Sequence, residues 1–128
     1  MRIFLDDVRS PVDVYKYTGI TLYLSDWLVV RSYDQFIEAI KYHGLPDIIS
    51  FDHDLGFTNE YYIESGLTSP EVDKTGYDCA KWLVNYCIDN KVKLPNYLVH
   101  SQNPVGAENI QNLMENYYKF EYANNNSK

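Results

Sequence analysis

The chain has 128 residues, a hydrophobic content of 45% and a net charge of −7. A chain of this length fits one domain with a buried core, so we expect a single domain over residues 1–128, with its core in 1–120 and a polar tail in 121–128. The acidic balance argues against a protein that coats long DNA or RNA, because such proteins need a basic surface. It permits a small phosphorylated ligand when a divalent cation supplies positive charge.

The apolar runs and the cysteines predict the compartment. No run is long enough to cross a bilayer, and acidic residues follow the N-terminal apolar run too early for a signal peptide. Cys79 and Cys87 lie in one helical pattern, separated by about 12 Å along the axis, which exceeds the reach of a disulfide. We therefore expect a cytoplasmic protein with reduced thiols and no membrane partner.

Short apolar runs and amphipathic stretches alternate along the chain. The expected elements, in order, are a strand in 2–7, a loop with at most a short helix in 9–25, a strand in 26–32, a helix in 32–44, a strand in 47–54, a polar loop in 55–75, a helix in 75–91, a strand in 94–103 and a helix in 104–120. Ser32 or Asp34 is the expected cap of the helix in 32–44, and Pro104 lies in the first turn of the last helix. Residues 119–124 are a candidate for a short fifth strand, which is otherwise missing.

The polar stretch in 55–75 is long for a connection in a compact domain, so we expect a lid or a mobile loop. Its Tyr61 and Tyr62, and the adjacent Tyr77, suit a platform for a nucleotide base as well as they suit a core. Trp27 and Trp82 are expected in the core.

Alternation of strands and helices predicts an α/β fold, a three-layer sandwich with a mostly parallel central sheet. In such sheets the ligand site lies beyond the carboxyl ends of the strands. Polar side chains follow the expected strands at those ends; they are Asp6, Asp7, Arg9, Arg31, Ser32, Asp52, His53, Asp54, His100, Ser101 and Asn103. One edge of the sheet is therefore expected to collect them.

The acidic members of this set predict a metal site. Asp6, Asp7 and Asp52, with Asp54 as a further candidate, would repel one another unless a cation neutralised them. Oxygen ligands suit Mg²⁺ or Mn²⁺ best, and Ca²⁺ as well, while a neighbouring histidine admits Fe²⁺ or Zn²⁺.

The remaining members suit a phosphate and a proton transfer. Arg9 can bind a phosphate in bidentate fashion, and the helix start at Pro104 offers backbone N–H groups beside Ser101 and Asn103. Arg31 is equally consistent with a phosphate contact and a surface salt bridge. His53 and His100 are the candidate proton donors or acceptors.

Each motif also has an ordinary structural explanation. Two aspartates at a strand end are more often a turn or a helix cap than a metal site, and a lone His100 is more often a hydrogen-bonded strand-end residue than a catalyst. The sequence from Ser101 to Gly106 is by itself ordinary capping and turn chemistry. The convergence of all of these groups on one sheet edge favours a functional site.

The layout resembles the receiver domain of two-component signalling, with an acid pair after the first strand, an aspartate after the third and a serine after the fourth. The resemblance implies that Asp6 and Asp7 bind Mg²⁺, that Asp52 accepts a phosphoryl group, and that Ser101 contacts it. A closer resemblance joins "LDDVRSP", "WLVVRSYDQF", "ISFDHDLG", "TGYDCAKWL" and "HSQNPVGAENI". Together these five motifs are similar to the cyclic-phosphate processing receiver-like family of bacteria and phages.

The second resemblance implies a receiver-type fold that processes cyclic phosphates, with a cyclic nucleotide or an RNA end as partner. Combined with the site, it leads to the hypothesis of a metal-dependent phosphoesterase in which Asp52 and either histidine take part in catalysis. If the strand persists through Asp54, Asp52 and Asp54 share one side and His53 does not, which favours His100 as the catalytic histidine. The alternatives are a non-catalytic module that sequesters a phosphorylated nucleotide, and a phospho-accepting receiver. The identity of the cyclic phosphate, the metal, the acting histidine and the oligomeric state stay open at this point.

Overall fold

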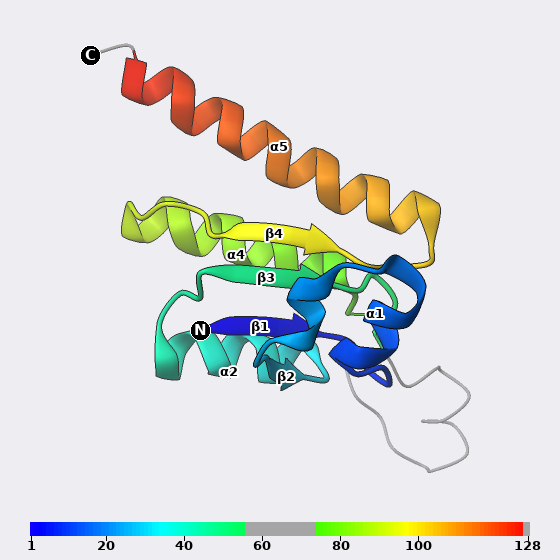
Figure 1. Ribbon diagram of the computed structural model, residues 1–128. Helices are drawn as coiled ribbons and strands as arrows, with labels where there is room; N and C mark the ends of the chain where they lie inside the picture. The colour runs from blue at the N-terminus through cyan, green and yellow to red at the C-terminus, as the bar shows by residue number, and fades with distance from the viewer. Residues whose placement is uncertain (56–73, 127–128) are drawn as a thin grey trace, which may run out of the picture.

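The computed structural model describes residues 1–55 and 74–126, without the side chains of 122–126. Its strands are β1 (Arg2–Leu5), β2 (Leu28–Val30), β3 (Ile48–Phe51) and β4 (Asn96–Val99). Its helices are α1 (Pro11–Thr18), the 3₁₀ helix η1 (Thr21–Leu24), α2 (Tyr33–His43), α4 (Gly76–Asn90) and α5 (Pro104–Asn126). Figure 1 shows the helices on the two faces of the central sheet.

All strand pairs are parallel, and the strand order is β2-β1-β3-β4. This order matches the first four strands of the flavodoxin-like order 2-1-3-4-5. The prediction of an α/β sandwich with a receiver-type topology is therefore confirmed. The first helix is reduced, as expected, to the eight residues of α1.

Local signals in the sequence account for where the helices begin. Ser32 caps α2 by accepting a hydrogen bond from the backbone N–H of Gln35, so Ser32 rather than Asp34 is the cap. Thr75 and Asp78 form a reciprocal capping box at the start of α4. The last helix starts at Pro104, as the position of this proline predicts.

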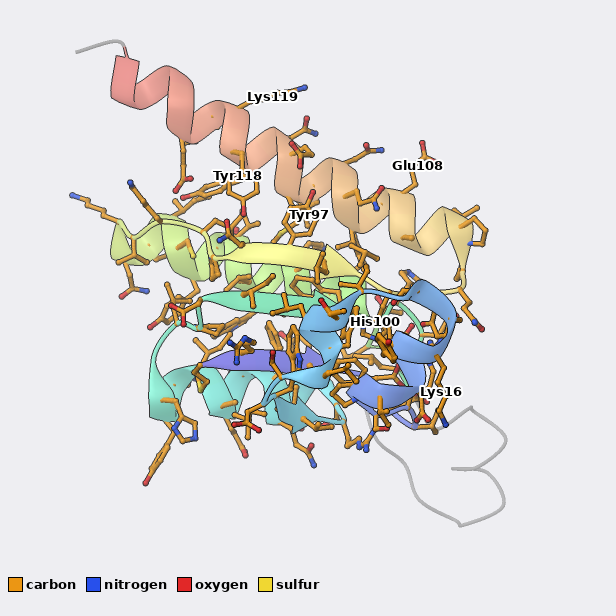
Figure 2. The ribbon with its side chains drawn as sticks, viewed as in Figure 1. Lys16, Tyr97, His100, Glu108, Tyr118 and Lys119 are labelled. Carbon is orange, nitrogen blue, oxygen red and sulfur yellow. The ribbon has the colours of Figure 1, made fainter. Side chains whose placement is uncertain are left out.

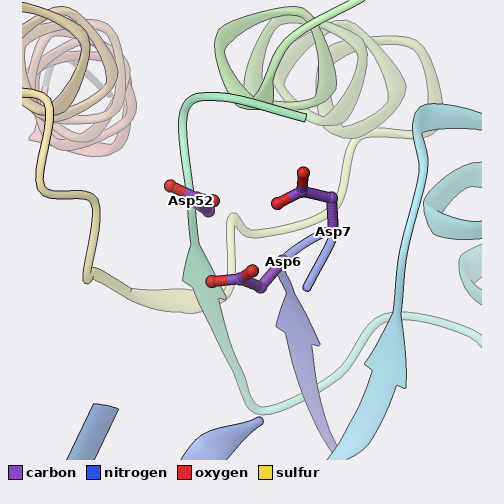
Figure 3. A group of neighbouring side chains, drawn as sticks. All are labelled: Asp6, Asp7 and Asp52. Atoms are coloured by element: carbon purple, nitrogen blue, oxygen red, sulfur yellow. The ribbon is translucent and has the colours of Figure 1, made fainter. Parts of the chain in front are cut away.

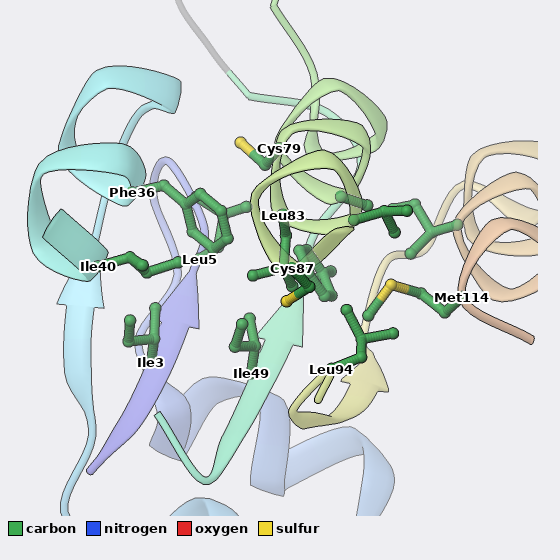
Figure 4. Close-up of a cluster of buried hydrophobic side chains, with 14 of the residues drawn as sticks. Ile3, Leu5, Phe36, Ile40, Ile49, Cys79, Leu83, Cys87, Leu94 and Met114 are labelled. Atoms are coloured by element: carbon green, nitrogen blue, oxygen red, sulfur yellow. The ribbon is translucent and has the colours of Figure 1, made fainter. Parts of the chain in front are cut away.

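The larger core lies between the sheet and helices α2, α4 and α5 (Figure 4). Phe36 of α2 and Phe51 of β3 meet there, with ring centroids 5.9 Å apart. Cys79 and Cys87 are buried in the same core and are not joined in a disulfide, which agrees with reduced thiols. Trp82 packs against its border, as expected for a core residue.

The opposite face of the sheet has a smaller core under α1 and η1. Phe4, Val14 and Tyr23 are buried there, and Trp27 packs against them. Polar groups adjoin this core, because the Tyr23 hydroxyl meets Ser50 Oγ, which in turn meets His100.

Residues 119–124, considered as a fifth strand, instead continue helix α5, which runs to Asn126. No glycine or proline interrupts the sequence after Gly106, so no local signal ends the helix earlier. Side-chain contacts hold it against β4: the ring of Tyr118 stacks on that of Tyr97 at 6.0 Å, and its hydroxyl donates to the Pro95 carbonyl (Figure 2).

Residues 56–73, with Tyr61 and Tyr62, lie outside the described part of the chain, and with them the predicted lid. Tyr77 is described, and it packs against the larger core. Within the described ranges, no helix has the length and apolar character needed to span a membrane.

Candidate metal and phosphate site

Three carboxylates meet at the carboxyl ends of two neighbouring strands. Asp6 and Asp7 directly follow β1, and Asp52 directly follows β3. One oxygen from each of them lies within 4.8 Å of the others, and Figure 3 shows the three carboxylates beside one another beyond the strand ends. The predicted gathering of acidic groups at this sheet edge is confirmed, because parallel pairing of β1 and β3 places their ends side by side.

Asp6 is the fully buried member of the group. Its Oδ1 accepts hydrogen bonds from the backbone N–H groups of Val8 (3.0 Å) and Arg9 (2.8 Å). Its Oδ2 accepts from Arg9 Nε (2.9 Å) and faces His100 Nε2 (3.0 Å). Burial alone would raise the pKa of this carboxyl, but the bonds from His100 and the two amides, with the charge of Arg9, lower it well below its usual range.

Asp52 is almost as deeply buried but has fewer partners. Its Oδ1 accepts the backbone N–H of His53 (2.9 Å) and lies 3.3 Å from Arg9 Nη2. None of the described residues donates a hydrogen bond to its Oδ2. Burial and the negative charge of Asp6 raise the pKa of this carboxyl, so the site holds an incompletely compensated acid.

A divalent cation fits this donor set. The three grouped ligands are carboxylates, with one guanidinium among them, and an incompletely paired buried carboxylate oxygen favours a positive partner. Hard oxygen ligands suit Mg²⁺, Mn²⁺ or Ca²⁺. Neither histidine belongs to the group, so the reason for considering Fe²⁺ or Zn²⁺ is weakened. Asp54, the fourth acidic candidate, lies outside the group and is exposed.

A cleft of about 350 Å³ opens over the carboxylates. The residues that line it are Asp7, Val8, Arg9, Asp52, Asp54, Gln102 and Asn103. All of these residues follow β1, β3 or β4, so the cleft lies at the edge that the topology predicts. Its volume is sufficient for a small ligand, at the lower end of the usual range.

Arg9 bridges two of the carboxylates, because its guanidinium contacts both Asp6 and Asp52. Its Nη1 donates to the hydroxyl of Tyr17 at 3.0 Å, and that hydroxyl donates to the backbone carbonyl of His100 at 2.7 Å. Burial would lower the pKa of Arg9, but the two aspartates raise it. The charged guanidinium of Arg9 is therefore the counter-ion of the acidic group in this structure.

Arg31 supports the backbone next to the cleft. Its Nη1 donates to the carbonyl oxygens of Asp6 and Arg9, and Arg31 is absent from the cleft lining. We predicted either a phosphate contact or a surface salt bridge for Arg31. The contacts of its Nη1 are instead hydrogen bonds to backbone carbonyls. These hydrogen bonds stabilise the turn after β1, which contains Asp6, Asp7 and Arg9.

His100 lies inside the protein rather than on the cleft. Its side chain is fully buried, and its ring stacks on Phe4 with centroids 4.5 Å apart. Its Nδ1 is 2.6 Å from Ser50 Oγ, which is 2.7 Å from the hydroxyl of Tyr23. A buried chain of hydrogen bonds thus runs from Tyr23 through Ser50 and His100 to Asp6.

His53 and Asp54 form a pair at the border of the cleft. His53 Nδ1 lies 2.9 Å from Asp54 Oδ1, and Asn103 Nδ2 approaches the same oxygen at 3.4 Å. The strand ends at Phe51, so the alternation of strand side chains does not extend to these residues. They lie instead on the turn that follows the strand.

The polar residues before α5 are used mainly for capping. Asn103 Oδ1 accepts the backbone N–H of Gly106 at 3.1 Å, and Ser101 Oγ accepts that of Asn103 at 3.1 Å. The amide of Gly106, one of the groups expected to bind an anion, is therefore already paired. Asn103 lines the cleft, whereas Ser101 is absent from its lining.

Two glycines that we did not predict as functional allow the helices α4 and α5 to approach the turn after β3 closely. A Cβ on Gly76 would lie 1.7 Å from the carbonyl oxygen of Asp52, and one on Gly106 would lie 2.2 Å from His53 Cγ. The first turns of α4 and α5 therefore touch the turn that carries Asp52 and His53. A glycine in the first turn of two successive predicted helices was the available signal.

Sequence reasoning also missed Ser50, Tyr17, Tyr23 and Gln102. Gln102 lies between two predicted site residues, so its place in the cleft had a local signal. Tyr17 and Tyr23 had none, because their partners are far away in the chain. Ser50 differed from its neighbours only in being a polar residue within an apolar run.

The comparisons with known proteins agree with this architecture. The family model described as "Cyclic-phosphate processing Receiver domain" matches residues 1–116. No curated protein and no solved structure matches the chain. The match spans all four strands, the three grouped carboxylates and most of α5. The chain therefore belongs to the cyclic-phosphate processing receiver domain family.

Proposed function

We propose that this protein is a metal-dependent phosphoesterase that opens a cyclic phosphate, in a cyclic nucleotide or at a 2′,3′-cyclic end of RNA. The observation that carries the proposal is the group of three neighbouring carboxylates, of which Asp7 and Asp52 line a cleft together with Arg9. Family membership supports a cyclic phosphate as the substrate class. The acidic surface favours a small ligand over a long nucleic acid, since the net charge is −7.

In this mechanism Asp6, Asp7 and Asp52 hold the cation. A divalent ion supplies Lewis acidity toward a phosphate oxygen and eases deprotonation of the attacking water. Asp6 is held by the buried chain from His100, so it serves as the fixed ligand. Asp52 offers an oxygen to which no described residue donates a hydrogen bond, and Asp7 lines the cleft beside it.

Arg9 positions the phosphate, and a pair of residues at the border of the cleft moves the proton. The guanidinium of Arg9 binds a non-bridging phosphate oxygen and offsets the charge that develops in the transition state. Water adds to phosphorus and releases a proton to the solvent, the bond from phosphorus to one ring oxygen breaks, and that oxygen takes up a proton. We assign this proton to the His53–Asp54 pair at the cleft border, because His100 is enclosed and both of its ring nitrogens have partners.

The test is a panel of 2′,3′-cyclic and 3′,5′-cyclic nucleotides incubated with the protein and Mg²⁺ or Mn²⁺. We expect the phosphate ring to open, as measured by chromatography and ³¹P NMR. Ring opening should cease when a chelator removes the metal. His53→Gln should lower the rate of ring opening more than it lowers substrate affinity. Absence of product with every cyclic phosphate and both metals would refute the proposal.

A specific observation favours a second candidate, a receiver that accepts a phosphoryl group or holds a ligand without catalysis. Asp52 presents an oxygen free of described donors, as a nucleophile would, and neither histidine lines the cleft. Incubation with acetyl phosphate and Mg²⁺ should then give a hydroxylamine-labile adduct that Asp52→Asn abolishes. Tight binding of a cyclic nucleotide without product or adduct would instead favour sequestration.

A further inference from the structure

The counter-ion of the acidic group is part of the protein itself, and this has consequences for metal binding. The guanidinium of Arg9 lies 2.9 Å from Asp6 through Nε and 3.3 Å from Asp52 through Nη2. It therefore compensates two of the three carboxylates that would hold a cation. A metal ion and this guanidinium therefore compete for the carboxylate oxygens of Asp6 and Asp52.

Asp6 shows why both cannot keep their contacts. A carboxylate has about four acceptor positions, and Asp6 uses them for the amides of Val8 and Arg9, for Arg9 Nε and for His100 Nε2. A cation that binds Asp6 must displace one of these donors. The donor that is displaced must be one whose side chain is able to move.

Three of the four donors are fixed by their surroundings. The two amides belong to the turn after β1, whose carbonyls Arg31 fastens. His100 is enclosed, stacked on Phe4 and bonded to Ser50. The side chain of Arg9 is long, 23% exposed and lines the cleft, so it is the donor that can leave.

We infer that a divalent cation displaces the Arg9 guanidinium from Asp6 and Asp52, and that the displaced guanidinium becomes the phosphate-binding group of the cleft. Metal binding and phosphate binding are then coupled through one side chain, and the metal binds first. Tyr17 limits the displacement, because its hydroxyl holds Nη1. The inference rests on the proposed function, since it needs the same metal site.

Calorimetric titration with MnCl₂ tests the competition. Arg9→Gln should bind Mn²⁺ more tightly than the wild type by about tenfold or more, because a positive charge that opposes the ion is removed. Arg9→Lys keeps the charge and should remain nearer to the wild type. Arg2→Gln is the matched control, since the Arg2 side chain donates its hydrogen bond to the Asp26 carbonyl, away from the carboxylates, and the affinity of this variant for Mn²⁺ should not change.

NMR of the wild type tests the displacement without any substitution. The chain has three arginines, at positions 2, 9 and 31, so the Nε–H region of the spectrum is simple. Saturation with Mg²⁺ should shift the Arg9 Nε–H signal and accelerate its exchange with solvent, while the Arg2 signal stays in place. Inorganic phosphate should bind equally weakly to the wild type and Arg9→Gln without metal, and more tightly to the wild type with Mg²⁺.

The outcomes separate this inference from the proposed function. If the wild type binds the metal but its Arg9 signal is unchanged, or if Arg9→Gln binds Mn²⁺ no more tightly, the displacement is wrong and the metal site stands. If neither the wild type nor Arg9→Gln binds Mg²⁺ or Mn²⁺, both the displacement and the metal-dependent function are wrong.

Discussion

The two faces of the sheet differ in what they contribute. The face under α2, α4 and α5 is a continuous apolar core, in which Phe36, Phe51 and Leu83 are completely buried. The face under α1 and η1 has a smaller core and carries the polar chain from Tyr23 through Ser50 to His100. Both faces pack against the strands whose ends form the site. The larger face stabilises those strands, and the smaller face also contacts Asp6 through His100.

The difference separates stability from positioning. Burial of apolar area supplies most of the free energy that favours folding, and the large face provides most of that area. Buried hydrogen bonds contribute less net free energy, but they restrict a side chain to one orientation. The chain on the smaller face ends at Asp6, so its main effect is expected on the metal site.

The largest effect on stability should follow from creating a cavity in the apolar core under α2, α4 and α5. Phe36→Ala removes a fully buried ring that contacts Phe51 and Trp82, and should lower the free energy of unfolding by about 3–5 kcal/mol. Chemical denaturation measures this change. Tyr42→Ala, on the same helix but 85% exposed, should change it little. A similar loss in both variants would contradict the assignment of the core.

Removal of the fixed carboxylate should affect the site more than the fold. Asp6→Asn should abolish metal binding and lower turnover of a cyclic phosphate by about 10²-fold or more, because a metal commonly contributes several kcal/mol to catalysis. Calorimetry and the substrate panel measure both effects. Asp89→Asn is a control with the same change in charge on the exposed, distant end of α4. Unchanged turnover in Asp6→Asn would refute the metal mechanism.

A smaller effect should follow from shortening the polar chain. Tyr23→Phe keeps the ring but removes the hydroxyl that meets Ser50, and should cost about 1 kcal/mol of stability. Because Ser50 then holds His100 less firmly, we also expect weaker metal binding by a few-fold. The comparison is Tyr97→Phe, which removes a hydroxyl bonded to Glu115 on the other face. Equal metal affinities in the two variants would contradict a positioning role.

The smallest effect concerns pH and the contact of α5 with β4. Burial raises the pKa of Tyr118 to about 12, and the nearby Glu115 and Glu121 add to this. In the unfolded chain the hydroxyl loses its proton near pH 10, so its contribution to stability is complete below pH 10 and is lost as the pH rises to about 12.

The measurement is the difference in unfolding free energy between the wild type and Tyr118→Phe. At neutral pH the wild type should be more stable by about 1 kcal/mol, because its hydroxyl donates to the Pro95 carbonyl. The difference should narrow between pH 10 and 12. A constant difference across that range would show that Tyr118 is not responsible for the pH dependence.

Much of the fold was predictable because its signals are local. Ser32 and Pro104 predicted the starts of α2 and α5, the amphipathic pattern predicted α4, and apolar runs predicted the four described strands. The end of α5 was not predictable in this way. Residues 119–124 have a composition compatible with a strand, and packing of the preceding tyrosines against β4 and α4 decided in favour of a helix.

By itself, the sequence determined which chemical groups reach the edge of the sheet, because strand ends and parallel pairing follow from local pattern and topology. Thus Asp6, Asp7 and Asp52 were predicted together, and they lie together. Only the tertiary structure decided how each group is used. Whether His100 faces the cleft or Ser50, and whether Arg9 faces solvent or two carboxylates, depends on partners distant in the chain, and packing alone brings those partners within hydrogen-bonding distance.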